Sequence, residues 1–178
     1  MISVNRYDKH LRSVGAEDEA EVHRLLCVPE VYEYLADGAE PPPSVTSDWI
    51  GGAVDSVRYG GGLWGLTSQR ERRILGLVRL SGDAEGELEL TYLLHPSIRG
   101  QGYATRMAHT ALNHAFGTRL VSAVRAGADV PNAASVAVMK RLGMTFRRDV
   151  EYPAGAGVEY VIEAAAFDRD RIELLSIV

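Results

Sequence analysis

The first third of the chain carries apolar residues at helical spacing in short segments. Acidic residues at 17–19 favour the start of one helix, and Pro29 should end it. A second helix should end at Gly38, and a third should be capped by Ser44 or Ser47. The apolar positions of these helices are Val22, Leu25, Leu26, Val31, Leu35, Ile50, Val54 and Val57. We therefore expect this third of the chain to be helical and irregular.

Beyond Gly62 the apolar period shortens to two, which is typical of strands. Residues 63–67 and 74–80 should form an antiparallel hairpin. The next run, 87–94, alternates between apolar and polar residues. Its two faces are Leu88, Leu90, Tyr92 and Leu94 on one side and Glu87, Glu89 and Thr91 on the other. This pattern predicts a strand with one buried face.

The second half of the chain combines both periods. An apolar stripe predicts a helix over 104–116, and a second helix over 133–142 should stop at Gly143. We expect one strand over 120–124 and two more within 144–167. Helices and strands mixed in this way indicate an α+β fold with a mixed sheet.

Composition adds bounds to this picture. The chain has 178 residues, 46% hydrophobic and 24% charged, which suits a single folded domain over 1–178. Its one cysteine, Cys27, has no partner for a disulfide within the chain and suits a reducing compartment. We find no signal peptide and no run of about 18 apolar residues, so we expect a cytoplasmic protein without a membrane segment. The net charge of −5 argues against nucleic acid as a partner.

The segment 95–104 joins a predicted strand directly to the start of a predicted helix. Unpaired backbone N–H groups and the positive end of the helix dipole make such a junction suitable for an anion. Gly100 and Gly102 would let a phosphate approach the main chain, although glycines also occur at turns for conformational reasons alone. Arg99 adds a positive charge. Two nucleotide loops do not fit, because Thr105 replaces the last glycine of the dinucleotide fingerprint and no G-K-[ST] sequence occurs. A dinucleotide oxidoreductase is therefore disfavoured.

The same segment resembles the pyrophosphate loop [RQ]-x-x-G-x-[GA] of the GNAT superfamily of acetyl-CoA-dependent N-acetyltransferases, with Arg99, Gly102 and Ala104 at its fixed positions. Downstream, residues 132–144 resemble the family's N-x-x-S…L-G-F segment. Residues 89–92, E-L-T-Y, resemble the E-[IL]-G-Y motif of the branch that contains ribosomal-protein N-terminal acetyltransferases, with threonine in place of the usual glycine.

The resemblance implies a GNAT-like, mainly antiparallel central sheet of about six or seven strands, flanked by helices. In this family the fourth strand carries a bulge and splays from the fifth, and the pantetheine arm of the coenzyme lies in the gap. Here the gap would be lined by Leu93, Leu94 and residues 120–124. A main-chain N–H near Leu94 would polarise the thioester carbonyl. Acetyl-CoA is then the co-substrate, and no metal is implied.

Similarity also implies which residues hold the coenzyme. Backbone N–H groups of the loop, together with the arginine that opens it, would bind the pyrophosphate; these residues are Arg99, Gly100, Gln101, Gly102, Tyr103 and Ala104. Asn132 would bond the pantetheine arm. In the other interpretation, its carboxamide oxygen caps the helix that follows.

Acetyl transfer to an amine needs a base, because an ammonium has no lone pair, and an acid for the departing thiolate. Many relatives supply the acid from a tyrosine at a position where this chain has Met139. Ser135 is the available hydroxyl, unless it only bonds the helix backbone. The candidate bases are Glu151, then Glu89, then His95, although a His-Pro at a strand end is more often a turn element.

These observations predict an enzyme that transfers acetyl from acetyl-CoA to a primary amine, a small amine or a protein N-terminus, by direct attack in a ternary complex. The alternative is an acyl-CoA-binding module without turnover, which the missing tyrosine supports. The expected acceptor side carries Asp37, Glu40, Asp48 and Asp55, which suit a cationic acceptor, although acidic stretches are commonly solvated surface. We expect a monomer or a homodimer, because the apolar residues beyond Phe167 can pack within the chain or against another subunit.

Overall fold

The computed structural model describes residues 9–35, 38–68, 73–82, 86–153 and 155–178, and within these residues seven strands form one sheet. The strand order is β1-β2-β3-β4-β5-β7-β6. The strands are Lys9–Ser13 (β1), Gly62–Ser68 (β2), Gly76–Ser81 (β3), Glu87–Leu94 (β4), Ala123–Asp129 (β5), Thr145–Tyr152 (β6) and Gly155–Glu163 (β7). The α-helices are Glu19–Leu26 (α1), Pro29–Tyr32 (α2), Pro43–Ser56 (α3), Tyr103–Gly117 (α4) and Ala133–Arg141 (α5).

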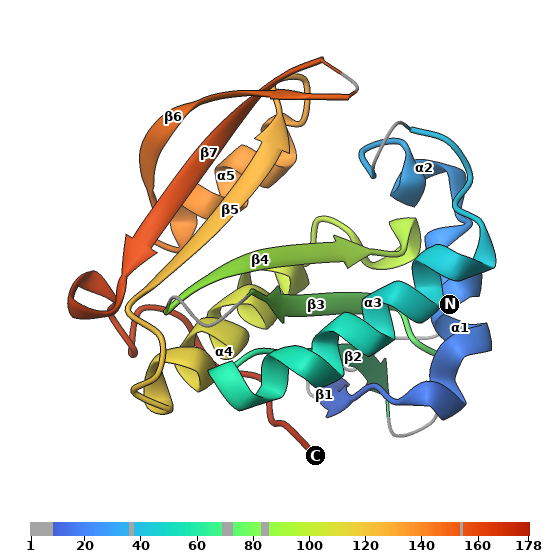
Figure 1. Cartoon of the computed structure of the whole chain (residues 1–178), viewed down its shortest axis with the longest axis horizontal. Helices are drawn as coiled ribbons and strands as arrows, with labels where there is room; N and C mark the ends of the chain where they lie inside the picture. Colours follow the sequence, from blue (N-terminus) through green and yellow to red (C-terminus); the bar gives the residue numbers. More distant parts are fainter. Residues whose placement is uncertain (1–8, 36–37, 69–72, 83–85, 154) are drawn as a thin grey trace.

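The centre of the sheet opens between β4 and β5. All other neighbouring strands are antiparallel, but β4 and β5 are parallel. They pair only where residues 87–89 of β4 lie beside residues 123–125 of β5. Beyond this point β4 stays with β3 and β5 stays with β7, so the two strands diverge like the arms of a V (Figure 1). The predicted mixed sheet and its gap are thereby confirmed.

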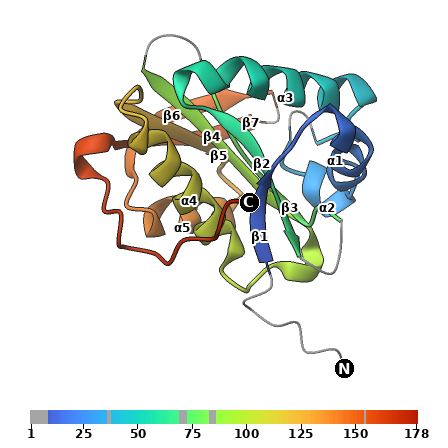
Figure 2. The same ribbon diagram turned by 90° about the horizontal axis from the view of Figure 1, so that it is seen from below.

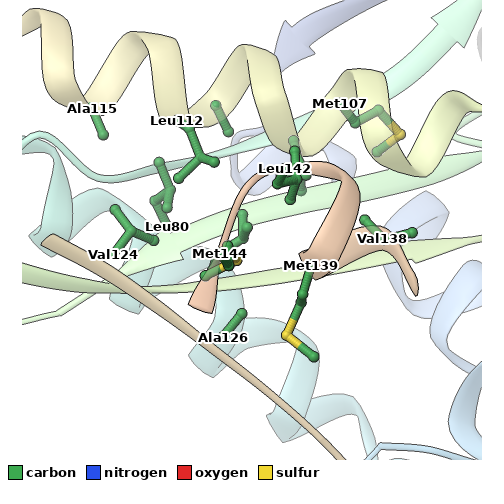
Figure 3. Packing of buried hydrophobic residues seen from close by; sticks show 14 of the residues in the cluster. Leu80, Met107, Leu112, Ala115, Val124, Ala126, Val138, Met139, Leu142 and Met144 are labelled. Carbon is green, nitrogen blue, oxygen red and sulfur yellow. The ribbon is translucent and has the colours of Figure 1, made fainter. Parts of the chain in front are cut away.

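Helices cover both faces of the sheet. Figure 2 shows α3 and α1 on one face and α4 with α5 on the other. Alternation along β4 explains why both faces need cover: Leu88 and Leu90 belong to the core beneath α4, whereas Leu93 belongs to the core beneath α1 and α3. Figure 3 shows the first of these cores, which contains Leu112 of α4 together with Met139 and Leu142 of the α5 segment.

The regular apolar stripes predicted α4 and α5 well. Both helices lie within a residue or two of the expected bounds, and Gly143 ends the second with a positive φ of 85°. The third helix differs from its prediction. Val54 and Val57 are exposed and the buried face is Thr46, Ile50, Ala53 and Ser56, while Pro42 occupies the N-cap and no side chain caps the helix.

Two strands differ from the prediction. β1 lies in a segment that the pattern indicated as helical and irregular, because its sequence K-H-L-R-S has only one strongly apolar residue and is held by pairing with β2. The fifth strand begins at Ala123 rather than at 120 and continues to Asp129. Its end, A-G-A-D, has low strand propensity and is kept extended by pairing with β7. The implied bulge is absent from the β3–β4 pairing, whose register is unbroken.

Candidate active site

A cavity of about 1040 Å³ lies where β4 and β5 separate. One part is bounded by the loop before α4, by the start of α4 and by α5. The other part is bounded by α2, α3 and β3, and by the end of the β6–β7 hairpin. A cavity of this volume, with both apolar and polar walls, is large enough for a small-molecule site.

The loop before α4 presents backbone N–H groups to this cavity. Gly100 and Gly102 have φ of 74° and 82°, a region that residues with a Cβ avoid, and a Cβ on either would meet no other atom within 4 Å. The helix begins at Tyr103, whose side chain is 1% exposed and packs in the core. The first N–H groups of α4 therefore lack carbonyl partners within the helix and are available to an anion.

Arg99 lines the cavity but is also tied to the backbone of two other segments. Its Nη2 donates to the carbonyl of Glu30 at 2.6 Å, and its Nε donates to the carbonyl of Leu94 at 3.3 Å. The arginine thus fastens the residues of α2 to the end of β4. Of the predicted coenzyme residues, only Gln101 lies outside the cavity lining.

The edge of β4 that faces the gap carries free backbone groups. The N–H of His95 donates to the carbonyl of Leu75 on the β3 side, so the N–H of Leu94 must point to the opposite side. Since β4 and β5 no longer pair at this point, the Leu94 N–H is directed into the gap. This is the position in which a main-chain N–H can polarise a carbonyl group.

Asn132, Ser135 and Tyr92 meet beside this edge. The Oδ1 of Asn132 accepts from the Ser135 N–H at 3.1 Å and so caps α5, while Asn132 also lines the cavity. The Tyr92 hydroxyl donates to the carbonyl of Ser135 at 3.0 Å and lies 2.9 Å from its Oγ. Burial raises the pKa of Tyr92 to about 12, so its hydroxyl stays protonated near neutral pH.

Sequence reasoning did not single out Tyr92. It appeared only as the last letter of the E-L-T-Y segment and as one member of the apolar face of β4. Met139, at the position where many relatives have the acid, is fully buried in the core. An acid in such a chain would have to come from another group near the gap, and this signal could have pointed to the Tyr92–Ser135 pair.

The candidate bases lie in different surroundings. Glu89 lines the cavity, and its Oε2 forms an ion pair with the Nη2 of Arg125 at 2.7 Å. Glu151 is exposed on β6 and lies outside the cavity lining, because alternation along the strand turns Tyr152 inward instead. His95 also lies outside the lining, and its Nδ1 accepts from the Ser97 N–H at the start of a short 3₁₀ helix.

Tyr152 is a second residue that the sequence analysis did not select. It reaches from β6 across β7, and a Cβ on Gly127 of β5 would overlap its hydroxyl. Burial raises the pKa of Tyr152, and the negative charges of Glu89, Glu159 and Asp129 raise it further. The side chain is therefore a neutral hydrogen-bond donor at the mouth of the cavity. Gly127 and Gly157 were the only sequence signals of this close approach.

Arg79 of β3 lines the part of the cavity beneath α3. Its guanidinium lies over the Trp49 ring, 5.4 Å from the centroid. Its Nε is buried, and within the described part of the chain no group forms a hydrogen bond or an ion pair with the side chain. Burial lowers the pKa of Arg79, and the charge of Glu89 acts in the opposite direction.

The acidic residues expected on the acceptor side do not form the cavity wall. Glu40, Asp48 and Asp55 are exposed and outside the lining, and Asp37 is outside the described residues. The carboxylates that do line the cavity are Glu30, Glu89 and Asp129.

Two features are absent from the described residues. No group of three or more His, Cys, Asp and Glu residues there is placed to hold a metal ion. No helix among them is both long enough and apolar enough to cross a membrane.

Comparison with known proteins places this fold. A family model for the acetyltransferase (GNAT) domain matches residues 10–145. Ribosomal-protein-S5-alanine acetyltransferase from Vibrio fischeri superposes with a TM-score of 0.75 at 12% identity, over 94% of this chain and 100% of that one. An aminoglycoside acetyltransferase in complex with ribostamycin and coenzyme A gives 0.74 at 19% identity, over 93% and 99%. Spermidine N-acetyltransferase from Vibrio cholerae, in complex with CoA and spermine, gives 0.71 at 14% identity, over 89% and 97%.

Proposed function

The chain belongs to the GNAT acetyltransferase family, and from this premise we propose that it transfers acetyl from acetyl-CoA to a primary amine in a ternary complex. The observation that carries the proposal is the continuity of the cavity. It runs from the loop of Gly100 and Gly102, past the free edge of β4, to the carboxylate of Glu89. The coenzyme and the acceptor can therefore meet inside one site.

The coenzyme would occupy the part of the cavity at α4 and α5. Backbone N–H groups at the start of α4 suit its pyrophosphate, and the gap between β4 and β5 suits its pantetheine arm. The Leu94 N–H would donate to the thioester oxygen as negative charge develops on it. Asn132 can cap α5 through Oδ1 and keep its NH₂ group for the arm.

The acceptor would enter from the α2 and α3 side as an ammonium cation. The carboxylates of Glu30, Glu89 and Asp129 favour a positive charge there. Glu89 would take one proton, directly or through water, and the neutral nitrogen would then attack the thioester carbon. The C–N bond forms, the C–S bond breaks, and the amine loses its second proton.

Ser135 is the hydroxyl placed to protonate the departing thiolate. Its Oγ can pass a proton to sulfur and recover one from the Tyr92 hydroxyl, 2.9 Å away. The raised pKa of Tyr92 keeps that hydroxyl protonated for this purpose. The ammonium loses two protons in all. One leaves through Glu89 to solvent, and the other is released to water as the C–N bond forms. Ser135 gives one proton to the thiolate and Tyr92 regains one from solvent, so the reaction yields the amide, the free thiol and one H⁺.

Calorimetry with acetyl-CoA tests the coenzyme site. Gly102→Glu places a negative charge where the pyrophosphate would lie, so we expect its affinity to fall at least about 100-fold while circular dichroism stays that of a folded protein. A substitution at the exposed Gly117, whose Cβ also meets nothing within 4 Å, serves as the control. Equal binding by wild type and Gly102→Glu would contradict the proposed site.

Turnover separates an enzyme from a coenzyme-binding module. Glu89→Gln should lower kcat by about 100-fold, and Glu151→Gln should stay within about twofold of wild type, because Glu89 lines the cavity and Glu151 does not. The readout is release of free thiol from acetyl-CoA with a panel of amines. Tight coenzyme binding without turnover on any amine would favour the module without catalysis, and a selective loss in Glu151→Gln would restore that residue as the base.

A further inference from the structure

Arg79 is a charged group in the acceptor part of the cavity whose charge is not neutralised by a bonded partner. It is half-buried, its Nε is buried without a hydrogen-bond partner, and no carboxylate among the described residues lies within ion-pair distance. A buried charge without a partner is costly, so such groups are normally paired. The neighbouring carboxylate of Glu89 is already bound to Arg125 at 2.7 Å.

The surroundings of Arg79 fix its position rather than neutralise it. The guanidinium lies over the Trp49 ring, 5.4 Å from its centroid, and the ring carries no acceptor group. Gly52 of α3 is also close, because a Cβ there would come within 2.8 Å of Nη2. A planar guanidinium held in this way offers parallel N–H donors to a planar anion.

Arg79 and Glu89 stand on the same face of two paired strands. Arg79 is opposite Thr91, and Glu89 is opposite Ser81, which makes the two residues diagonal neighbours. Diagonal positions are about 7–8 Å apart at Cα. A small molecule with an ammonium and a carboxylate can therefore reach Glu89 with one end and Arg79 with the other.

We propose that Arg79 binds a carboxylate of the acceptor, so that the acceptor is an amine that carries a carboxylate of its own, such as an amino acid or a short peptide. This inference rests on the proposed amine acetylation. It assigns opposite tasks to two charged residues of the cavity: Glu89 receives the amine, and Arg79 selects and orients the acceptor through its acid group.

Matched acceptor pairs test the inference. Standard amino acids that have a primary amine and no side-chain carboxylate are compared with their C-terminal amides, which keep the amine and lose the negative charge, and spermidine and kanamycin serve as purely cationic amines. The readout is the ratio of kcat/KM for acid over amide. We expect a wild-type ratio of at least about 100 for the preferred side chain, because an unpaired guanidinium disfavours the neutral analogue.

Two neighbouring glycines provide variants that keep the arginine. Gly52→Ala should displace the guanidinium, whereas Gly51→Ala meets nothing within 4 Å. Both replace a helical glycine by a better helix former, so neither should destabilise α3 through helix propensity. We expect the acid-over-amide ratio to fall at least tenfold in Gly52→Ala and to stay at the wild-type value in Gly51→Ala. Arg79→Gln should remove the preference, and Arg58→Gln, at an exposed arginine, should not.

The outcomes separate this inference from the proposed function. Acetylation of spermidine, kanamycin or the amides with no preference for acids would overturn the role of Arg79 and leave amine acetylation standing. An acid preference that is unchanged in both Arg79→Gln and Gly52→Ala would also overturn it. Failure to acetylate any amine, in a preparation that binds acetyl-CoA, would overturn both.

Discussion

At the scale of single residues, the polar groups of the cavity are held by partners that lie far away in the sequence. Tyr92 bonds Ser135, Arg99 bonds the carbonyl of Glu30, and Glu89 pairs with Arg125. Each of these contacts occupies a donor or acceptor that a sequence motif alone would suggest is free to bind a ligand. The side chain of Arg79 is the contrasting case, since it lies over an aromatic ring and has no hydrogen-bond or ion-pair partner among the described residues.

The raised pKa of Tyr92 makes stability depend on pH in the alkaline range. An unfolded chain ionises this tyrosine near its ordinary pKa of about 10, whereas the folded protein keeps the proton up to about 12. Between these values the unfolded state binds fewer protons, so the free energy of unfolding falls as pH rises. From pH 9 to pH 11, wild type should lose about 1 kcal/mol more than Tyr92→Phe in urea titrations.

Tyr34→Phe is the control for this measurement, because Tyr34 is 40% exposed and belongs to the same acceptor region. It should lose stability with pH as wild type does. An identical loss in wild type and Tyr92→Phe would show that this hydroxyl ionises in the folded state as it does in the unfolded chain.

At the scale of elements, the candidate site depends on the separation of strands β4 and β5. β4 and β5 share only a short parallel stretch, and each then follows a different neighbour. An ion-pair cluster holds the paired end together, because Arg125 of β5 contacts glutamates of both β4 and β7. The other end is left open for a ligand.

The end of the β6–β7 hairpin can approach β5 because Gly127 and Gly157 leave room for the Tyr152 side chain. Gly127→Ala should push Tyr152 off β5 and cost about 1–3 kcal/mol of stability in urea unfolding, as overpacking commonly does. In a Tyr152→Ala background the same change should cost far less, because no hydroxyl remains to clash. Purely additive effects in this double-mutant cycle would rule out the contact as the cause.

At the scale of the whole molecule, the C-terminal segment closes the fold beside β1. Leu175 is 5% exposed, and its N–H donates to the Thr110 hydroxyl of α4 at 3.0 Å. The Leu11 N–H donates to the carbonyl of Ser176, and the Val178 N–H donates to the carbonyl of Leu11, both at 2.9 Å. Figure 2 shows the C-terminus next to β1. The apolar residues beyond Phe167 were expected to pack either within the chain or against another subunit, and some of them thus pack within the chain.

Leu175→Ala should lower the free energy of unfolding by about 2–4 kcal/mol, because it leaves a cavity in the core. Its neighbour Leu174 is 41% exposed, so Leu174→Ala should change stability by less than about 0.5 kcal/mol. Denaturant unfolding of the two variants side by side decides the matter, and equal effects would mean that the segment is not docked as described.

What the sequence determined by itself was local. The apolar periods of α4, α5 and β4 predicted these elements, since each period reports which side of an element is buried. The glycines at 100 and 102 predicted a turn that leads into a helix, and the structure gives both of them a positive φ, which few other residues accept. The resemblance of residues 99–104 and 132–144 to family motifs then indicated the family, which the family model confirms, and the coenzyme loop stays a prediction.

Only the tertiary structure decided which side chains share the cavity. β6 lies at the sheet edge beyond β7, and the direction of its alternation, which turns Tyr152 inward and Glu151 outward, follows from pairing with β7. β1 and the end of β5 are likewise extended because of their partners, not their own residues. Strand order and register bring together residues that are distant in the chain. A local sequence pattern does not indicate which distant residues will become neighbours. The lack of a bonded partner for Arg79 among the described residues was also decided by the tertiary structure, because it depends on all the residues that surround the side chain.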